Sequence, residues 1–189
     1  MVEAGPHAVV LVEGISDRIA LETLAARRGR DLEGEGVAVV PIGGAQAIGR
    51  FLARFGPQGA NVRLAGLCDA GEETVFRRAL ERAGLGLELT RPGLERLGFH
   101  VCEADLEDEL IRAVGPPSIE TILEANGDLR PFRTFQKQPA WRGRSVDRQM
   151  RRFLCSSDRR KLRYARLLVE ALEPEQMPRP LDAVLAHVG

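Results

Sequence analysis

The 189-residue sequence has few cysteines, histidines and aromatic residues, and it has no long apolar run. Its three cysteines form no CxxC pair and the N-terminus does not resemble a secretory signal, so we expect reduced thiols and a cytoplasmic protein. The three histidines are scattered and offer no zinc-binding spacing. No segment approaches the roughly 18 apolar residues that a membrane-spanning helix needs. The sequence therefore does not indicate a disulfide-stabilised, zinc-binding or membrane-spanning protein.

The first 115 residues alternate between two hydrophobic patterns. Continuous apolar segments rich in β-branched residues predict buried strands at residues 8–14, 37–44, 62–69 and 98–103. A segment of helical periodicity follows each strand, and Ser16 is the expected N-cap of the first helix. This alternation predicts βαβ units, a parallel four-stranded sheet and an α/β fold with helices flanking the sheet.

The strand pattern ends after Pro116. Helices are expected within residues 117–126, 145–172 and 178–188, and residues 127–144 are expected to form an irregular basic connector. We therefore predict an α/β core in residues 1–115 and a mainly helical subdomain in residues 116–189 that packs on this core.

The net charge is zero, but it is unevenly distributed. Residues 1–129 contain 13 basic and 21 acidic side chains, whereas residues 130–166 contain 13 basic and 2 acidic ones. A strongly basic segment of this kind indicates a polyanionic partner such as nucleic acid. An arginine-rich solvated surface is the alternative. The candidate nucleic-acid-binding residues are Arg142, Arg144, Arg148, Arg151, Arg152, Arg159 and Arg160.

Carboxylates follow three of the four predicted strands. They are Glu13 and Asp17 after the first strand, Asp69, Glu72 and Glu73 after the third, and Glu103, Asp105, Glu107, Asp108 and Glu109 after the fourth. The carboxyl ends of parallel strands meet at one edge of a sheet, where α/β proteins bind ligands. Clustered carboxylates repel one another unless a cation compensates, and a set of oxygen ligands suits Mg²⁺ or Mn²⁺.

Each acidic group also has an ordinary structural interpretation. Acids in the first turn of a helix interact favourably with the helix dipole, and Asp105 is a plausible N-cap with Asp108 three residues later. This interpretation explains Glu13 and Asp69 less well, because both directly end an apolar strand. Three acidic groups at one sheet edge favour a metal site.

Two further motifs do not indicate an ATP-binding site or a catalytic nucleophile. The segment GGAQAIGRF has glycines spaced as in a phosphate-binding loop, but Arg50 and Phe51 replace the lysine and the serine or threonine. We expect a turn and a helix start there and no ATP site in this chain. Ser156 and Ser157 lack a nearby histidine, so a helix cap before Asp158 explains them better than a nucleophile does.

The ordered acidic motifs resemble a TOPRIM domain, in particular the C-terminal nuclease region of the OLD (overcoming lysogenization defect) family. LVEGISD matches the Glu-Gly turn, with Asp17 placed as in OLD nucleases, and GLCDAGEE matches the aspartate motif at Asp69. Gly71 stands where that motif usually has its second aspartate, and Glu72 or Glu73 is the candidate replacement. VCEADLEDEL and the final 30 residues are similar to the rest of the OLD region, and Lys161 matches its lysine.

The resemblance implies an Mg²⁺- or Mn²⁺-dependent nuclease that cleaves phosphodiester bonds of DNA by nicking or end processing. Glu13, Asp69 and Lys161 would be catalytic, and the metal ligands, for one or two ions, would be Glu13, Asp17, Asp69, Glu73, Asp105 and Glu107. OLD nucleases carry an ABC-type ATPase before this region, and this chain begins at the first strand, so a stand-alone TOPRIM protein with a separate ATPase partner is expected.

Two alternatives stay open at this point. The first is a catalytically silent nucleic-acid-binding or regulatory subunit, which the glycine in Asp69-Ala70-Gly71 favours. The second is a phosphohydrolase that acts on small phosphoesters, which the basic segment disfavours. DNA versus RNA, strand preference, the number of metal ions and a homodimeric state are not predicted.

Overall fold

A four-stranded parallel sheet organises the N-terminal part of the molecule. The computed structural model describes residues 5–189, and its strands are β1 (Ala8–Val12), β2 (Val37–Pro41), β3 (Arg63–Asp69) and β4 (Phe99–Cys102). Their order is β2-β1-β3-β4, and each neighbouring pair is parallel. The predicted α/β fold with a four-stranded parallel sheet is confirmed. Because all strands run the same way, Glu13, Asp69 and Glu103 lie at the same edge of the sheet.

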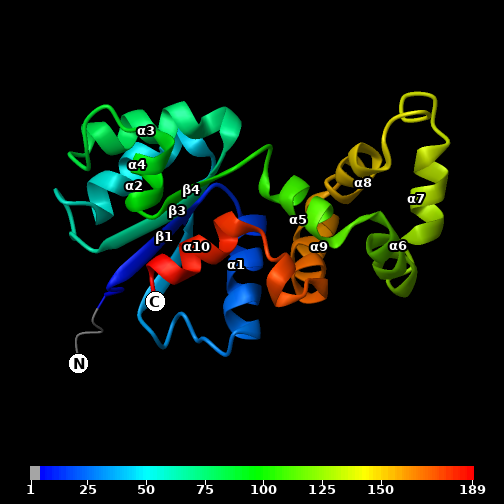
Figure 1. Cartoon of the computed structure of the whole chain (residues 1–189), viewed down its shortest axis with the longest axis horizontal. Coiled ribbons are helices and arrows are strands. Elements are labelled where there is room, and N and C mark those ends of the chain that lie inside the picture. The colour runs from blue at the N-terminus through cyan, green and yellow to red at the C-terminus, as the bar shows by residue number, and fades with distance from the viewer. Residues whose placement is uncertain (1–4) are drawn as a thin grey trace.

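Helices cover both faces of this sheet (Figure 1). One face packs against α2 (Ile48–Phe55), α3 (Glu73–Arg82) and α4 (Arg91–Arg96). The other face packs against α1 (Ile15–Arg27) and α10 (Arg179–His187), and α5 (Leu106–Val114) lies beyond the carboxyl edge of the sheet beside α9. Since β1 is central and buried on both faces, its five residues are all apolar.

The remaining helices extend the molecule away from the sheet (Figure 1). They are α6 (Pro116–Ala125), α7 (Leu129–Gln136), α8 (Val146–Leu154) and α9 (Asp158–Ala171). Three-residue 3-10 turns lie at Ala45–Ala47, Ala70–Glu72 and Pro174–Gln176. One apolar cluster runs without a break from β1 and α1 through α9 to Phe132 and Phe153. The helical part is therefore fixed to the sheet by continuous side-chain packing.

Polar contacts reinforce the junction between α1 and α9. The guanidinium of Arg27 donates hydrogen bonds to the carbonyl oxygens of Val169 and Leu172, both at 2.6 Å. These two carbonyls belong to the C-terminal end of α9, where Val169 accepts only the long 3.4 Å hydrogen bond from the N–H of Leu172. The orientation of α9 relative to the sheet is thus set by both apolar packing and hydrogen bonding.

The structure corrects two expectations about local structure. Residues 127–144 are not wholly irregular, because Leu129–Gln136 form α7; Pro131 lies in its first turn, where the missing N–H costs no hydrogen bond. Ser16 is not the N-cap of α1, because the helix begins at Ile15 and Gly14 occupies the cap position. Among residues 5–189, no helix is long and apolar enough to cross a membrane.

Candidate metal and nucleic-acid site

Glu13 links the ends of the two central strands. It directly follows β1, and its Oε1 accepts a hydrogen bond of 3.2 Å from the backbone N–H of Asp69 at the end of β3. Burial raises the pKa of Glu13, and the negative charges of Glu72 and Glu107 add to this effect, while the hydrogen bond and Lys161 oppose it. A half-buried carboxylate with a raised pKa is one that a bound cation would stabilise.

Asp69 lies at the centre of the acidic cluster. Burial raises its pKa from 3.8 to about 7, and the negative charges of four further carboxylates contribute, those of Glu13, Asp105, Asp17 and Glu107. The five acids come from β1, α1, β3 and α5, so the parallel sheet brings them together as the sequence predicts. Carboxylates that raise one another's pKa values at one edge of a sheet are typical of a functional site.

Asp17 has a structural role in addition to its place in the cluster. Its Oδ2 accepts a hydrogen bond of 2.7 Å from the backbone N–H of Gly14 and so satisfies one free donor at the start of α1. This contact explains why the helix begins before Ser16. Burial nevertheless raises the pKa of Asp17 to about 6, and Glu107 adds to the shift.

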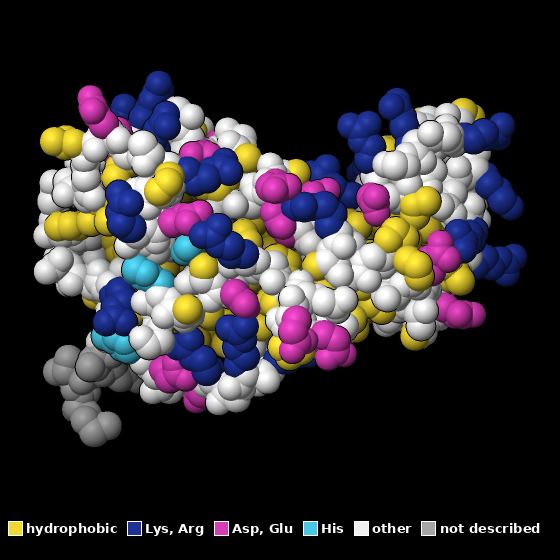
Figure 2. All heavy atoms as spheres, viewed as in Figure 1, with side chains coloured by type: hydrophobic (Ala, Val, Ile, Leu, Met, Phe, Trp, Pro, Cys, Tyr) yellow, Lys and Arg dark blue, Asp and Glu magenta, His cyan; other side chains and the backbone are white. Residues whose placement is uncertain are grey.

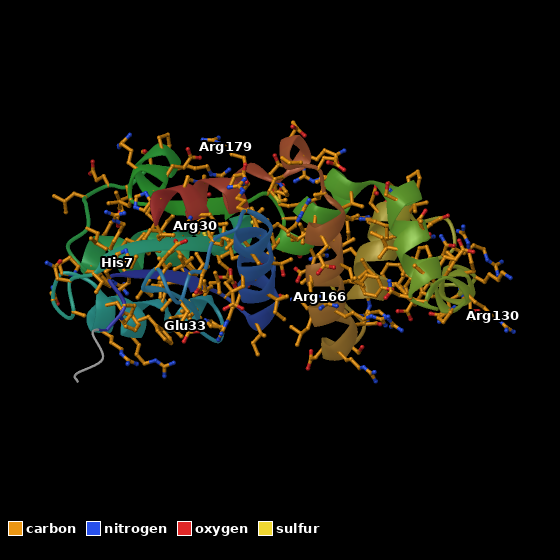
Figure 3. All side chains as sticks on the ribbon, turned by 90° about the horizontal axis from the view of Figure 1, so that it is seen from below. His7, Arg30, Glu33, Arg130, Arg166 and Arg179 are labelled. Carbon is orange, nitrogen blue, oxygen red and sulfur yellow. The ribbon has the colours of Figure 1, made fainter. Side chains whose placement is uncertain are left out.

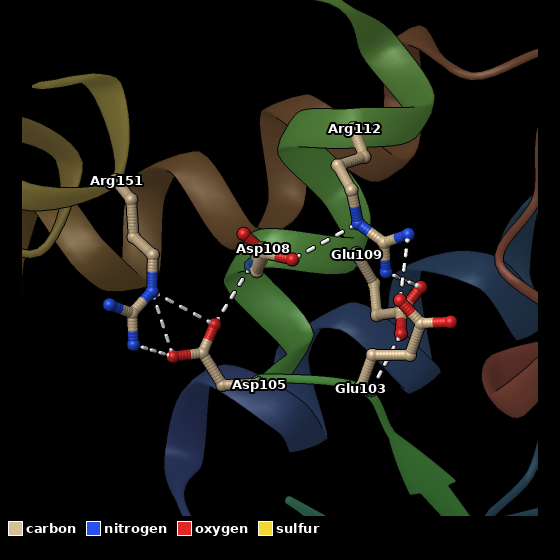
Figure 4. Close-up of polar contacts among 6 residues, drawn as sticks. All are labelled: Glu103, Asp105, Asp108, Glu109, Arg112 and Arg151. Atoms are coloured by element: carbon tan, nitrogen blue, oxygen red, sulfur yellow. Dashed lines mark hydrogen bonds and ion pairs between the residues drawn. The ribbon is translucent and has the colours of Figure 1, made fainter. Parts of the chain in front are cut away.

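Basic residues of the helical part form ion pairs with the two cluster acids at the start of α5, Asp105 and Glu107. Arg151 of α8 pairs with both oxygens of Asp105, with its Nε at 2.9 Å from Oδ2 and 3.2 Å from Oδ1 (Figure 4). Asp105 also caps α5 by accepting from the N–H of Asp108 at 2.8 Å. The Nζ of Lys161 on α9 lies 3.1 Å from Oε1 of Glu107. Lys161 thus reaches the acidic cluster.

The remaining acids of the three groups form other contacts. Glu73 pairs with Arg91 of α4, with Nε and Oε2 3.1 Å apart, so Glu72 is the acid of that group whose charge acts on Glu13. Arg112 binds the acids of the third group that lie outside the cluster, Glu103, Asp108 and Glu109 (Figure 4). Glu73, Glu103, Asp108 and Glu109 therefore have other ion-pair partners and are not among the five acids of the cluster, which are Asp69 and the four acids around it.

The five acids do not form a preassembled metal site. Within residues 5–189, no three His, Cys, Asp or Glu side chains are arranged so that they could hold a metal ion as they stand. The donor chemistry nevertheless fits Mg²⁺ or Mn²⁺, since every candidate ligand is a carboxylate oxygen. Oε1 of Glu107 is also buried without an aligned hydrogen bond; its contact with Lys161 is an ion pair only. A bound cation would provide a partner for this oxygen. It would also stabilise the charged form of the neighbouring carboxylates, whose pKa values are raised.

A cavity of about 480 Å³ opens beside Asp105 and Glu107. Basic residues of α8, α9 and the preceding loop line it, namely Arg144, Arg148, Arg151, Arg152 and Lys161. Figure 2 shows that Lys and Arg side chains gather over the end of the molecule that carries α6 to α8. Four of the seven arginines that the sequence singles out therefore lie around one cavity at the edge of the acidic cluster.

The other three predicted arginines lie outside this cavity lining. Arg142 is exposed and donates to the carbonyl of Lys137 at 3.3 Å, and Arg159 is exposed near the start of α9. Arg160 has structural partners: it pairs with Asp128 at 3.2 Å and its guanidinium lies 4.2 Å from the centre of the Phe153 ring. Ser157 caps α9 as expected, by accepting from the N–H of Arg160.

No local sequence pattern predicts the pairing of Arg151 with Asp105, which joins residues 46 positions apart. The sequence does predict that Trp141 and Phe135, in the basic segment, either stack on bases or are buried in the helical subdomain. In the structure Trp141 lines the cavity while its ring packs against Phe135 at 5.2 Å between ring centres.

Comparison with known proteins identifies the fold. Residues 7–70 match the family model of the overcoming lysogenization defect protein-like TOPRIM domain. This part of the chain is thus similar to an OLD-like TOPRIM domain. The match includes Glu13, Asp17 and Asp69, whereas Asp105, Glu107 and Lys161 lie beyond it. This TOPRIM domain suggests a nuclease-type or metal-binding function.

Solved structures extend the likeness to nearly the whole chain. The C-terminal region of the Burkholderia pseudomallei OLD protein superimposes with a TM-score of 0.74 at 18% identity, covering 97% of both chains. The corresponding region of the Xanthomonas campestris pv. campestris OLD protein gives a TM-score of 0.71 at 22% identity, covering 97% of this chain and 94% of the other. No curated protein matches the sequence. The predicted resemblance to the OLD C-terminal region is thus confirmed for the TOPRIM domain and for the fold.

Proposed function

We propose that this protein is an Mg²⁺- or Mn²⁺-dependent nuclease that cleaves phosphodiester bonds of DNA by nicking or end processing. The observation that carries the proposal is the cluster of five carboxylates formed by Asp69 and the four acids around it, which adjoins a cavity lined by cations. A cation-binding site next to a phosphate-binding surface is the arrangement that phosphodiester hydrolysis requires. The protein would act in the cytoplasm, and RNA is a second substrate to be tested.

The carboxylates would hold the metal. Glu13 and Asp69 are the central ligands because the hydrogen bond between them fixes the ends of β1 and β3. Asp17, Asp105 and Glu107 would complete one or two sites, and Glu73 would join only after leaving Arg91. When bound, Mg²⁺ or Mn²⁺ would lower the pKa of an attacking water and stabilise negative charge on the phosphate.

The basic residues would bind the substrate. Lys161 is placed beside Glu107 and would neutralise charge that develops on the scissile phosphate. Arg144, Arg148, Arg151 and Arg152 would contact backbone phosphates, and the exposed Arg142 and Arg159 would extend this contact. Phosphate contacts of this kind fix the position of a strand without reading its sequence, so we expect little sequence preference.

The test is cleavage of supercoiled plasmid and of linear DNA with Mg²⁺, Mn²⁺ or EDTA. We expect nicked or shortened products only with a divalent cation, and a loss of at least 100-fold in rate for Glu13→Gln and for Asp69→Asn, because each removes a charged ligand. The Lys161→Ala variant should lower the rate while retaining cation binding. Folded wild-type protein that leaves DNA intact with both cations would overturn the proposal.

The alternative is a silent nucleic-acid-binding or regulatory TOPRIM subunit that works with a separate ABC-type ATPase. Gly71 in place of a second aspartate and the contacts of Asp105 and Glu107 with Arg151 and Lys161 favour it. It predicts DNA binding of equal strength with and without Mg²⁺, no heat of Mn²⁺ binding, and no cleavage. Cation-dependent cleavage by the purified chain would exclude it.

A further inference from the structure

The cavity beside the acidic cluster has the size and the chemistry of a nucleotide-binding pocket. Its volume of about 480 Å³ lies within the roughly 300–1,000 Å³ typical of small-ligand sites. It is lined by the start of α5, the length of α8, the first turn of α9 and the loop before α8.

The lining combines an aromatic ring with guanidinium groups. Trp141 is half-buried, its ring is supported by Phe135, and its carbonyl oxygen accepts a hydrogen bond of 2.9 Å from Nε2 of Gln149, which is itself buried. These contacts hold the tryptophan in place before any ligand binds. Any of the nucleic-acid bases can stack on an aromatic ring or on an arginine side chain.

The charges of the cavity also favour a nucleotide. Arg144, Arg148 and Arg152 form no ion pair with any of the described residues 5–189. Arg151 and Lys161 are paired only with Asp105 and Glu107, two members of the acidic cluster. A phosphate in this position would lie between unpaired arginines and the carboxylates that hold the metal in the proposed function.

We infer that this cavity binds one unpaired nucleotide of a DNA strand next to the bond that is cleaved. A base can enter a cavity only when it is unpaired or turned out of the duplex. The substrate is therefore single-stranded, frayed or gapped DNA, and a fully paired duplex must open before it is cleaved. This inference rests on the proposed function and specifies its substrate class.

The first experiment uses the single tryptophan of the chain as a reporter. Oligothymidylate of eight nucleotides is titrated into the protein in EDTA, where no cleavage occurs, while Trp141 fluorescence and the anisotropy of an end-labelled strand are recorded. We expect saturable quenching by the single strand. A duplex dumbbell whose two ends are closed by non-nucleotide ethylene glycol linkers, compared at equal phosphate concentration, should bind about ten-fold more weakly and leave the emission unchanged. Equal affinity for both, or saturable binding of the single strand without quenching, would overturn the inference.

Variants separate base stacking from phosphate attraction. Trp141→Phe keeps an aromatic ring and should retain anisotropy-measured affinity, whereas Trp141→Ala should lose about ten-fold or more, as expected for one stacked base. Arg148→Ala should also weaken binding, and the control is Arg166→Ala, an exposed α9 residue outside the cavity that pairs with Glu170 (Figure 3). Unchanged binding by both Trp141→Ala and Arg148→Ala would overturn the inference.

The two proposals fail in different ways. Quenching by single strands without cation-dependent cleavage would contradict the nuclease function while leaving the pocket intact. Cation-dependent cleavage of the closed dumbbell at the rate of the single strand would contradict the pocket while leaving the nuclease function intact.

Discussion

Asp69 connects the stability of the protein with pH and with cation binding. Its pKa is about 7 in the folded protein and 3.8 as the ordinary value, so the folded state binds the proton more tightly than the unfolded chain does. The free energy of unfolding therefore falls as the pH rises from about 4 to about 7 in the absence of a cation. Asp17, with a pKa of about 6, contributes in the same direction.

Asp69→Asn should remove most of this pH dependence. In EDTA at pH 8 we expect the variant to unfold at a higher temperature than the wild type, because a neutral amide ends the repulsion with Glu13. Mg²⁺ should stabilise the wild type at pH 8 and not the variant. The measurement is thermal unfolding at pH 4 and pH 8. Glu22→Gln, which removes an exposed carboxylate of α1, is the control and should leave the pH profile unchanged.

Gly71 offers a second test at the residue scale. It is exposed, and a Cβ atom added there meets no other atom within 4 Å, so an aspartate fits without strain. Gly71→Asp would place another carboxylate two residues after Asp69, and we expect Mn²⁺ to bind several-fold more tightly in calorimetry. Gly71→Ala adds the Cβ without the charge and serves as the control. Equal Mn²⁺ affinity of the two variants would show that this position does not reach the metal.

The sequence could predict Glu13 and Asp69 because each ends a continuous apolar strand, and parallel strands end at one edge. Lys161 was found only through the resemblance to a family, since a lysine in a basic segment carries no local signal. The partners of the acids were not predictable, because Arg151 and Arg91 come from helices whose packing depends on long-range contacts. Glu73 was therefore grouped with the ligands although it pairs with Arg91.

At the scale of elements, α8 determines whether one candidate metal ligand at the start of α5 is available to a cation. Arg151 binds both oxygens of Asp105 and so competes with any cation for them. Arg151→Gln should free Asp105 and tighten Mn²⁺ binding by about two- to five-fold, the range for a partly exposed ion pair. The same variant should weaken DNA binding, since it removes a cavity-lining cation.

The matched control is Arg112→Gln. Arg112 binds three acids near the same end of α5, but these lie outside the cluster around Asp69 (Figure 4). Its removal should change neither Mn²⁺ affinity nor DNA affinity. Weaker Mn²⁺ binding in Arg151→Gln than in Arg112→Gln would mean that Arg151 positions Asp105 as a ligand and does not compete for it.

Element boundaries were predicted best where periodicity and capping agreed. The four strands coincide with continuous apolar runs, and the predicted helices come after them. In contrast, α7 lies in a segment whose proline and many charges conceal its one buried face. Phe132 provides that face and packs against Phe153 at 5.2 Å between ring centres. Leu129 and Phe135 are only partly buried against the same apolar cluster, so the helical pattern of this segment is too weak to be recognised in the sequence.

For the whole molecule, the two charged regions meet at one place. The uneven distribution of charge was visible in the sequence, but the contact between the acidic sheet edge and the basic helices was not, because it depends on how α9 packs on α1. The acids repel a polyanion and the arginines attract it. DNA binding by the whole molecule should therefore depend strongly on salt and on divalent cations.

Salt titrations of DNA affinity test this picture quantitatively. In EDTA, the logarithm of the association constant should fall linearly with the logarithm of salt concentration, with a slope of about −0.7 per contacted phosphate for a single strand. The slope should become less steep, by the amount expected for about one phosphate contact, in each of the variants Arg144→Ala, Arg148→Ala and Arg152→Ala. Arg78→Ala removes an exposed cation of α3, on the other face of the sheet, and should leave the slope unchanged. An equal change for Arg78→Ala and for the three cavity variants would mean that net charge, and not the cavity, governs binding.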